Sequence, residues 1–231
     1  MKATRWEFEN RALIIGLVFA AAFLCSPLDP RNAAVALAEP LAAWLHVEAD
    51  RAARAIFALA AVCVTLGALI RTWASAYLAA DVVYAGSVKT ASLVADGPYR
   101  FVRNPLYFAN VLLAVGMGAM ASRLGFALLS GLMLLFSYRL ILREEGELAS
   151  AQGEGYAAYR VRVPRLVPAL RPRTPSAGRQ PHWANGFKAE AWYWGFAAAI
   201  ATFAATLSVK LFFVILSASI ATLWVVTSRS G

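Results

Sequence analysis

Long apolar runs alternate with short charged segments along this chain. Six runs carry almost no charge and are predicted to be membrane-spanning helices: Ala12–Cys25, Ala55–Ile70, Leu106–Ser122, Leu124–Leu142, Ala191–Val209 and Leu211–Val226. Apolar runs approaching about 20 residues are typical of such helices. The segment from Ala33 to His46 is short and is interrupted by Glu39 and Pro40, so we expect it to lie at the membrane interface. The pattern predicts an all-α, polytopic membrane protein with six transmembrane helices.

The first run could also belong to a cleaved signal peptide, because a basic segment precedes it. However, Glu7 and Glu9 interrupt that basic segment, and the run ends in SPLDP rather than in a small-residue cleavage site. We therefore expect a retained helix.

The third and fourth runs are separated by a single residue, Arg123. So short a connection predicts a tight antiparallel helical hairpin. The residues before the third run and after the fourth should then meet at the same membrane face. This hairpin is the most specific structural expectation of the sequence.

Composition supports the membrane assignment and orients it. Of the 231 residues, 60% are hydrophobic and 15% are charged, whereas a soluble domain is about a quarter charged. The net charge is +9, and basic residues concentrate between Arg139 and Lys188. This excess favours the cytoplasmic side of an inner membrane, with both termini and the site on that side. The lipid bilayer is the expected partner, and nucleic acid is not expected because no recognition motif accompanies the charge.

The cysteine and histidine content offers no metal centre. Cys25 and Cys63 lie inside apolar runs without a ligand or disulfide spacing. His46 and His182 are far apart in the sequence. No metal ion is therefore expected.

A dense polar motif, GPYRFVRNPLYFAN (Gly97–Asn110), precedes the third run. Its glycine-proline and asparagine-proline pairs indicate turns, and Pro105 is well placed as the first residue of a helix, with Asn104 as its cap. Free N–H groups at a helix start suit a carboxylate ligand. A cytoplasmic loop with snorkelling arginines would look similar.

The fourth run ends in YRLILREEGEL, a second polar cluster. Arg139 and Arg143 are one helical turn apart on one face. Glu144 and Glu145 point about 100° apart, so they cannot serve one site equally. A charge cluster at a helix end is common in itself, but the hairpin would bring this one beside the polar motif. Together they would form a pocket for a ligand with cationic and anionic groups.

The ordered motifs LVADGPYRFVRNPLY, REEGEL and GEGYAAYRVRVPRLVP, with an apolar hairpin between the first two, resemble a known family. This is the superfamily of isoprenylcysteine carboxyl methyltransferases and phospholipid methyltransferases, which are integral membrane enzymes. The resemblance covers roughly Ala55 to Leu170. It implies S-adenosylmethionine as cofactor and methyl transfer to a lipophilic small molecule or a lipidated acceptor.

The resemblance also implies roles for particular residues. It assigns cofactor contacts to Ala91, Ser92, Leu93, Val94, Tyr99, Asn104, Pro105, Leu106, Tyr107, Glu144 and Glu145. It places a substrate-contacting arginine just before the acid pair, at Arg139 or, with a shift of register, at Arg143.

Asn104 stands where the family usually has histidine, and it cannot take up a proton near neutrality. This favours an acceptor that needs no general base, such as a carboxylate.

We therefore expect four parts: residues 1–54, with the first span and the interfacial segment; 55–170, the methyltransferase core; 171–189, a linker rich in proline and arginine; and 190–231, a helical hairpin. A phospholipid N-methyltransferase is the alternative within the enzymes. A transporter or a non-catalytic scaffold is the alternative outside them, although the spans hold few ionisable residues.

Overall fold

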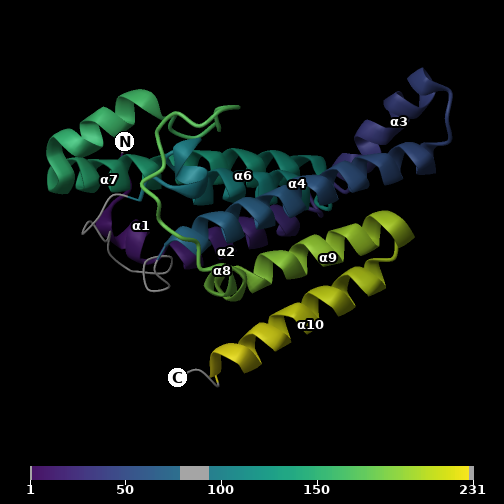
Figure 1. The fold of residues 1–231 in the computed structure, drawn as a ribbon. Coiled ribbons are helices and arrows are strands. Elements are labelled where there is room, and N and C mark those ends of the chain that lie inside the picture. Colours follow the sequence, from purple (N-terminus) through teal and green to yellow (C-terminus); the bar gives the residue numbers. More distant parts are fainter. Residues whose placement is uncertain (1, 79–93, 229–231) are drawn as a thin grey trace. The chain divides into compact units, whose positions relative to one another are not determined.

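The computed structural model describes residues 2–78 and 94–228, and the regular elements in these ranges are helices (Figure 1). They are α1 (Arg5–Glu9), α2 (Arg11–Leu24), α3 (Ala33–Leu45), α4 (Ala49–Tyr77), the 3-10 helix η1 (Gly97–Arg100), α6 (Pro105–Gly118), α7 (Arg123–Arg162), α8 (Trp183–Ala189), α9 (Ala191–Thr206) and α10 (Val209–Ser228). The predicted all-α class is confirmed for these residues.

Two helices of the described ranges, α4 and α7, are long and apolar enough to cross a membrane. The apolar helices α2, α3 and α6 have 14, 13 and 14 residues. Such helices are about 21 Å long, which is less than the roughly 30 Å of a hydrocarbon core. The prediction of six spans and of a transmembrane hairpin therefore remains a prediction.

Contacts divide the chain into two compact units. The first unit contains Met1–Gly16, Leu69–Val111 and Met133–Glu190, and so includes both polar clusters of the sequence. The second unit contains Leu17–Ala68, Leu112–Leu132 and Ala191–Gly231.

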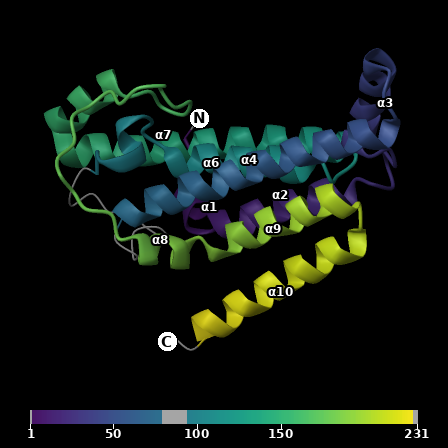
Figure 2. The same ribbon diagram turned by 45° about the vertical axis from the view of Figure 1, so that its right-hand side comes forward.

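The second unit packs through small residues. A Cβ atom on Gly116 of α6 would lie 2.7 Å from the carbonyl oxygen of Ala60 in α4, so glycine allows these helices to approach. The turn after α6 is closed by Asn32, whose amide nitrogen donates to the carbonyls of Ala119, Met120 and Ala121 at 3.1 Å each. α9 and α10 lie side by side in opposite directions (Figures 1 and 2).

In the first unit, α7 is broken at Gly153, which has φ 52° and ψ −126°. The positive φ is costly for any residue except glycine, and it turns the second half of the helix. Tyr156, Tyr159 and Val163 of that half form a buried cluster. The hydroxyl of Tyr159 donates to the carbonyl of Tyr99 at 2.7 Å. The GEGYAAYRVRVP motif therefore contacts the polar motif at Tyr99 and helps to hold it in place.

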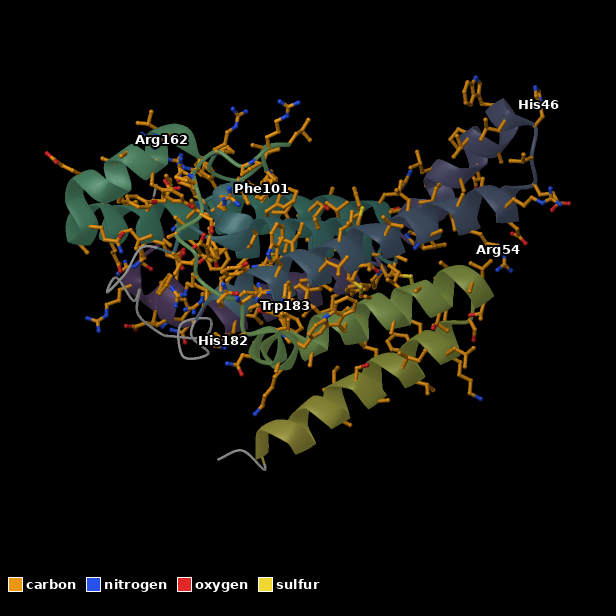
Figure 3. All side chains as sticks on the ribbon, viewed as in Figure 1. His46, Arg54, Phe101, Arg162, His182 and Trp183 are labelled. Atoms are coloured by element: carbon orange, nitrogen blue, oxygen red, sulfur yellow. The ribbon has the colours of Figure 1, made fainter. Side chains whose placement is uncertain are left out.

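The segment that leads into α8, which belongs to the first unit, contacts α4. The carbonyl of Ala76 in α4 accepts from the backbone N–H of His182, which lies at the start of α8 (Figure 3). Residues 183–189, inside the predicted linker, form α8. Gly186 of this helix lies against the backbone of Thr72, where a Cβ atom would meet the carbonyl oxygen at 2.5 Å.

Candidate functional site

Backbone hydrogen bonds hold the polar motif in place. Gly97 has φ +58° and lies against the ring of Tyr77, so its position requires glycine for both conformation and space. The carbonyl of Phe101, labelled in Figure 3, accepts from the N–H of Ala169, and the N–H of Arg103 donates to the carbonyl of Pro164 at 2.9 Å. The backbone that follows α7 thereby positions the start of α6.

Glu145 lies at the centre of a buried charged cluster. Its Oε1 accepts from Arg103 Nε at 2.9 Å and from Asn104 Nδ2 at 3.0 Å, and its Oε2 accepts from Arg165 Nε at 3.0 Å. Burial alone would raise the pKa of Glu145, but these hydrogen bonds and the Arg103 charge hold it below its usual value. Both oxygens of this carboxylate are therefore engaged by the chain itself.

Glu144, one residue earlier, has a different environment. Its Oε1 accepts from the hydroxyl of Tyr107 at 2.7 Å, and its side chain is partly exposed. Burial raises the pKa of Glu144 to about 7, and the Tyr107 hydrogen bond acts in the opposite direction. The part of α7 before the break at Gly153 is about 45 Å long, which exceeds the roughly 30 Å of a hydrocarbon core. Glu144 follows the apolar part, Leu124–Leu142, and so lies in the polar part of this helix.

Helix α6 begins with Pro105, Leu106 and Tyr107, and Asn104 directly precedes it. The amide nitrogen of Asn104 donates to Glu145 and to the carbonyl of Arg165, the latter at 2.9 Å. This asparagine therefore joins three segments of the first unit. Pro105 is buried and Leu106 is partly exposed.

The remaining predicted cofactor residues lie before α6. Tyr99 is buried, and burial raises the pKa of its phenol above the usual value. Val94 is half-buried. Ala91, Ser92 and Leu93 lie outside the described residues.

The two predicted substrate arginines contact the N-terminal segment. Arg139 Nη2 donates to both oxygens of Glu7, at 2.8 and 2.7 Å. Arg143 pairs with Glu147 at 2.8 Å and lies over the ring of Phe8. The contact between these arginines and the N-terminal segment was not predicted from the sequence. The capping box formed by Thr4 and Glu7 was the available signal for a helix here.

A buried ion pair joins α4 to the end of α8, and sequence reasoning missed it. Arg71 Nε and Nη2 donate to Glu190 at 2.5 and 3.1 Å, and Arg71 Nη1 donates to Asn110 at 2.8 Å. Ser75 donates to Glu190 at 2.6 Å. Glu190 is fully buried, so its charge must be balanced inside the protein.

Asp96 ties the proline-rich segment to the polar motif. Its carboxylate accepts from the Ser176 hydroxyl at 2.6 Å and from the N–H groups of Ala177 and Arg179 at 2.9 and 3.1 Å. Burial would raise the pKa of Asp96, but these hydrogen bonds hold it below its ordinary value. Residues 176–179 are therefore held at Asp96, directly before the polar motif.

The segment that contains the Tyr107–Glu144 contact matches a known protein family. Residues 55–152 match the family model of phospholipid methyltransferases. This family is part of the superfamily of membrane methyltransferases that the motifs resemble, so the predicted resemblance is confirmed over these residues.

Two curated bacterial relatives match at similar identity. The nickel-cobalt-cadmium resistance protein NccN of Alcaligenes xylosoxydans xylosoxydans is 31% identical over 107 residues, which is 46% of this chain and 47% of that protein. The cobalt-zinc-cadmium resistance protein CzcN of Cupriavidus metallidurans is 30% identical over 107 residues, which is 46% of each chain. The chain thus spans about half the length of these relatives. No solved structure matches the chain.

Proposed function

We propose that this protein is an S-adenosylmethionine-dependent membrane methyltransferase that acts on a lipophilic acceptor, with a carboxylate favoured. The observation that carries the proposal is the Tyr107–Glu144 hydrogen bond, because it joins two motif residues within the family-matched segment. The adjacent Glu145 is already engaged by Arg103, Asn104 and Arg165. This leaves Glu144 as the acid of the pair with capacity for a ligand.

The chemistry of this donor set fits the cofactor. A carboxylate can accept several hydrogen bonds, and Tyr107 uses one oxygen of Glu144, so the group can also accept from the cofactor's ammonium. The start of α6 offers backbone N–H groups and a partial positive charge to the cofactor's carboxylate. The resemblance adds contacts from Tyr99, Asn104 and residues 91–94. When bound, the cofactor supplies an electrophilic methyl group.

A carboxylate acceptor suits the remaining residues. Such a group is ionised at neutral pH and needs no general base, and Asn104 could not supply one. Arg139 or Arg143 would orient it, because a guanidinium binds carboxylate in a fixed geometry. Catalysis would then rest on positioning the acceptor and excluding water.

We further propose that the chain spans the inner membrane six times, with the site facing the cytoplasm. The family match and the apolar helices α4 and α7 support a membrane location. Cysteines placed at Arg123 and Gln152 should then be labelled from opposite sides of the membrane. Labelling of both from one side would exclude a hairpin that turns at Arg123.

Cofactor binding by the purified protein tests the proposed function directly. In detergent, S-adenosylmethionine should bind the wild type, and Glu144→Gln should weaken binding. Loss of a hydrogen bond to a charged group costs about 1.5–3 kcal/mol, which is roughly tenfold to 150-fold in Kd. Glu154→Gln, at an exposed glutamate beyond Gly153, is the matched control and should bind like the wild type. If the wild type does not bind S-adenosylmethionine, the methyltransferase proposal is excluded, and the scaffold and the transporter are the alternatives that remain.

The family description favours a second candidate, a phospholipid N-methyltransferase. Labelled methyl transferred from the cofactor to lipid extracts separates the two reactions. A methyl ester releases its label as methanol in base, whereas an N-methyl group retains it.

A further inference from the structure

The N-terminal helix α1 places a carboxylate on the arginine that we propose for the acceptor. Glu7 accepts from Arg139 Nη2 through both oxygens, at 2.8 and 2.7 Å. One nitrogen of the guanidinium thus contacts both oxygens, and arginine binds carboxylate ligands through charge-assisted hydrogen bonds of the same kind. Glu7 also lies outside the family-matched segment, which begins at residue 55.

The whole N-terminal segment covers this face of α7. The N–H of Ala3 donates to the carbonyl of Arg139 at 3.0 Å, and the carbonyl of Ala3 accepts from Arg143 Nη1 at 3.4 Å. The ring of Phe8 is buried beneath Arg143, whose guanidinium lies 5.7 Å from the ring centroid. The Nε of Arg143 is buried and has no hydrogen-bond partner within the part of the chain that the structure describes. Both arginines therefore face the same short segment.

The Glu7–Arg139 pair is more exposed than the Arg103–Glu145 pair of the same unit. The side chains of Arg139 and Glu7 are 23% and 24% exposed, whereas those of Arg103 and Glu145 are 8% and 5% exposed. An ion pair contributes less to stability as its exposure rises, because water competes for both groups. Glu7 also accepts from the N–H of Thr4 at 2.6 Å, so it retains a partner when it leaves Arg139. A ligand carboxylate can therefore replace it at low cost.

We infer that Glu7 is an internal competitor for the acceptor site, and that a carboxylate acceptor binds Arg139 only after displacing it. This inference rests on the proposed function for the role of Arg139. It makes α1 a gate on the acceptor side of the site and makes Glu7 a determinant of its affinity.

A pair of matched probes tests the competition in the full-length protein. The probes are N-dodecanoylglycine, which carries a carboxylate, and N-dodecanoylglycinamide, which has the same chain without the charge. Binding is measured by calorimetry in non-ionic detergent. Glu7→Gln should bind the carboxylate probe about tenfold more tightly than the wild type, because apparent affinity scales with the fraction of receptor that is open. The amide probe should bind both proteins equally.

Two controls isolate the contact. Glu9→Gln removes the neighbouring acid of α1, which pairs with the exposed Arg5, and should leave both probes unaffected. Arg139→Gln should abolish the preference for the carboxylate probe. Equal affinity of the wild type and Glu7→Gln for the carboxylate probe would overturn the inference.

Hydrogen exchange on the wild type keeps the test valid if Glu7→Gln fails to fold. Amides of residues 3–9 should exchange faster when the carboxylate probe is bound than when the amide probe is bound. Equal exchange with the two probes would overturn the gate. S-adenosylmethionine binding is measured on the same samples: its absence would remove the proposed methyltransferase function without affecting the competition result.

Discussion

The two compact units are stabilised by different kinds of contact. In the first unit, buried charges are paired across long sequence separations, as between Arg71 and Glu190 and between Arg103 and Glu145. In the second unit, mainly alanine, aliphatic and aromatic side chains form a continuous apolar core, and Gly116 lies directly against α4.

The two kinds of contact act differently: charged pairs select particular partners, whereas apolar packing depends on how well volume is filled. Buried charges must be desolvated, so they stabilise a structure only where each has a partner in good geometry. Such pairs fix the direction of the segments that carry Tyr107 and Glu144. Apolar packing has no direction, but it is sensitive to volume. The first unit is therefore suited to hold a ligand, and the second to provide a scaffold.

The largest loss of stability should come from breaking the ion pair between Arg71 of α4 and Glu190. Glu190→Ala removes the carboxylate that faces Arg71 and should cost about 3–5 kcal/mol of unfolding free energy. Denaturant unfolding in detergent, followed by tryptophan fluorescence, measures this loss. The double variant Arg71→Met, Glu190→Leu removes both charges and should lose less than the single variant. A single variant as stable as the wild type would show that the pair does not orient these segments.

The second unit should respond to volume instead. Gly116→Ala adds a Cβ atom 2.7 Å from the carbonyl of Ala60 and should destabilise by about 1–3 kcal/mol. Gly131→Ala is the matched change in α7, where an added Cβ atom would meet nothing within 4 Å among the described residues outside the helix's own backbone. Helix propensity should make this change stabilising by up to about 1 kcal/mol. The same unfolding assay measures both. Equal effects at the two glycines would contradict the close approach of α4 and α6.

The smallest effect concerns the pH dependence of the acid pair. The pKa of Glu144 in the folded protein is about 7, above its ordinary value of 4.5, so the folded state holds this proton more tightly than the unfolded state. Stability from this group is therefore present below pH 4.5 and is lost as pH rises to about 7, by on the order of 1–2 kcal/mol for a partly exposed group.

Unfolding free energies of the wild type and Glu144→Gln, compared between pH 5 and pH 8, measure this loss. The wild type should lose stability relative to the variant across the interval. A constant difference would show that Glu144 titrates at its ordinary pKa.

Much of the candidate site follows from local sequence. Pro105 and Asn104 predict the start of α6, and the acid pair beyond the fourth apolar run predicts a polar helix end. The expectation that Glu144 and Glu145 cannot serve one site equally follows from helical geometry alone. Their contacts agree with it: Tyr107 bonds Glu144, and Asn104 bonds Glu145.

The long-range pairs could not be predicted in the same way. Arg71 and Glu190 are 119 residues apart, and each reads as an ordinary charge at the end of an apolar run. Arg139 and Glu7 are 132 residues apart. Nothing in the local pattern says which of several arginines meets which acid, because a charge is compatible with many partners until the chain brings one close.

The sequence by itself determined the helical class, the family resemblance and the residues of the acid pair, because hydrophobic periodicity and short motifs are local properties of the chain. The tertiary structure alone decided which carboxylate is engaged by the chain's own arginines, Glu145, and which one is bonded by Tyr107, Glu144. That choice depends on burial and on the distance between charges, and both arise only when distant segments pack together.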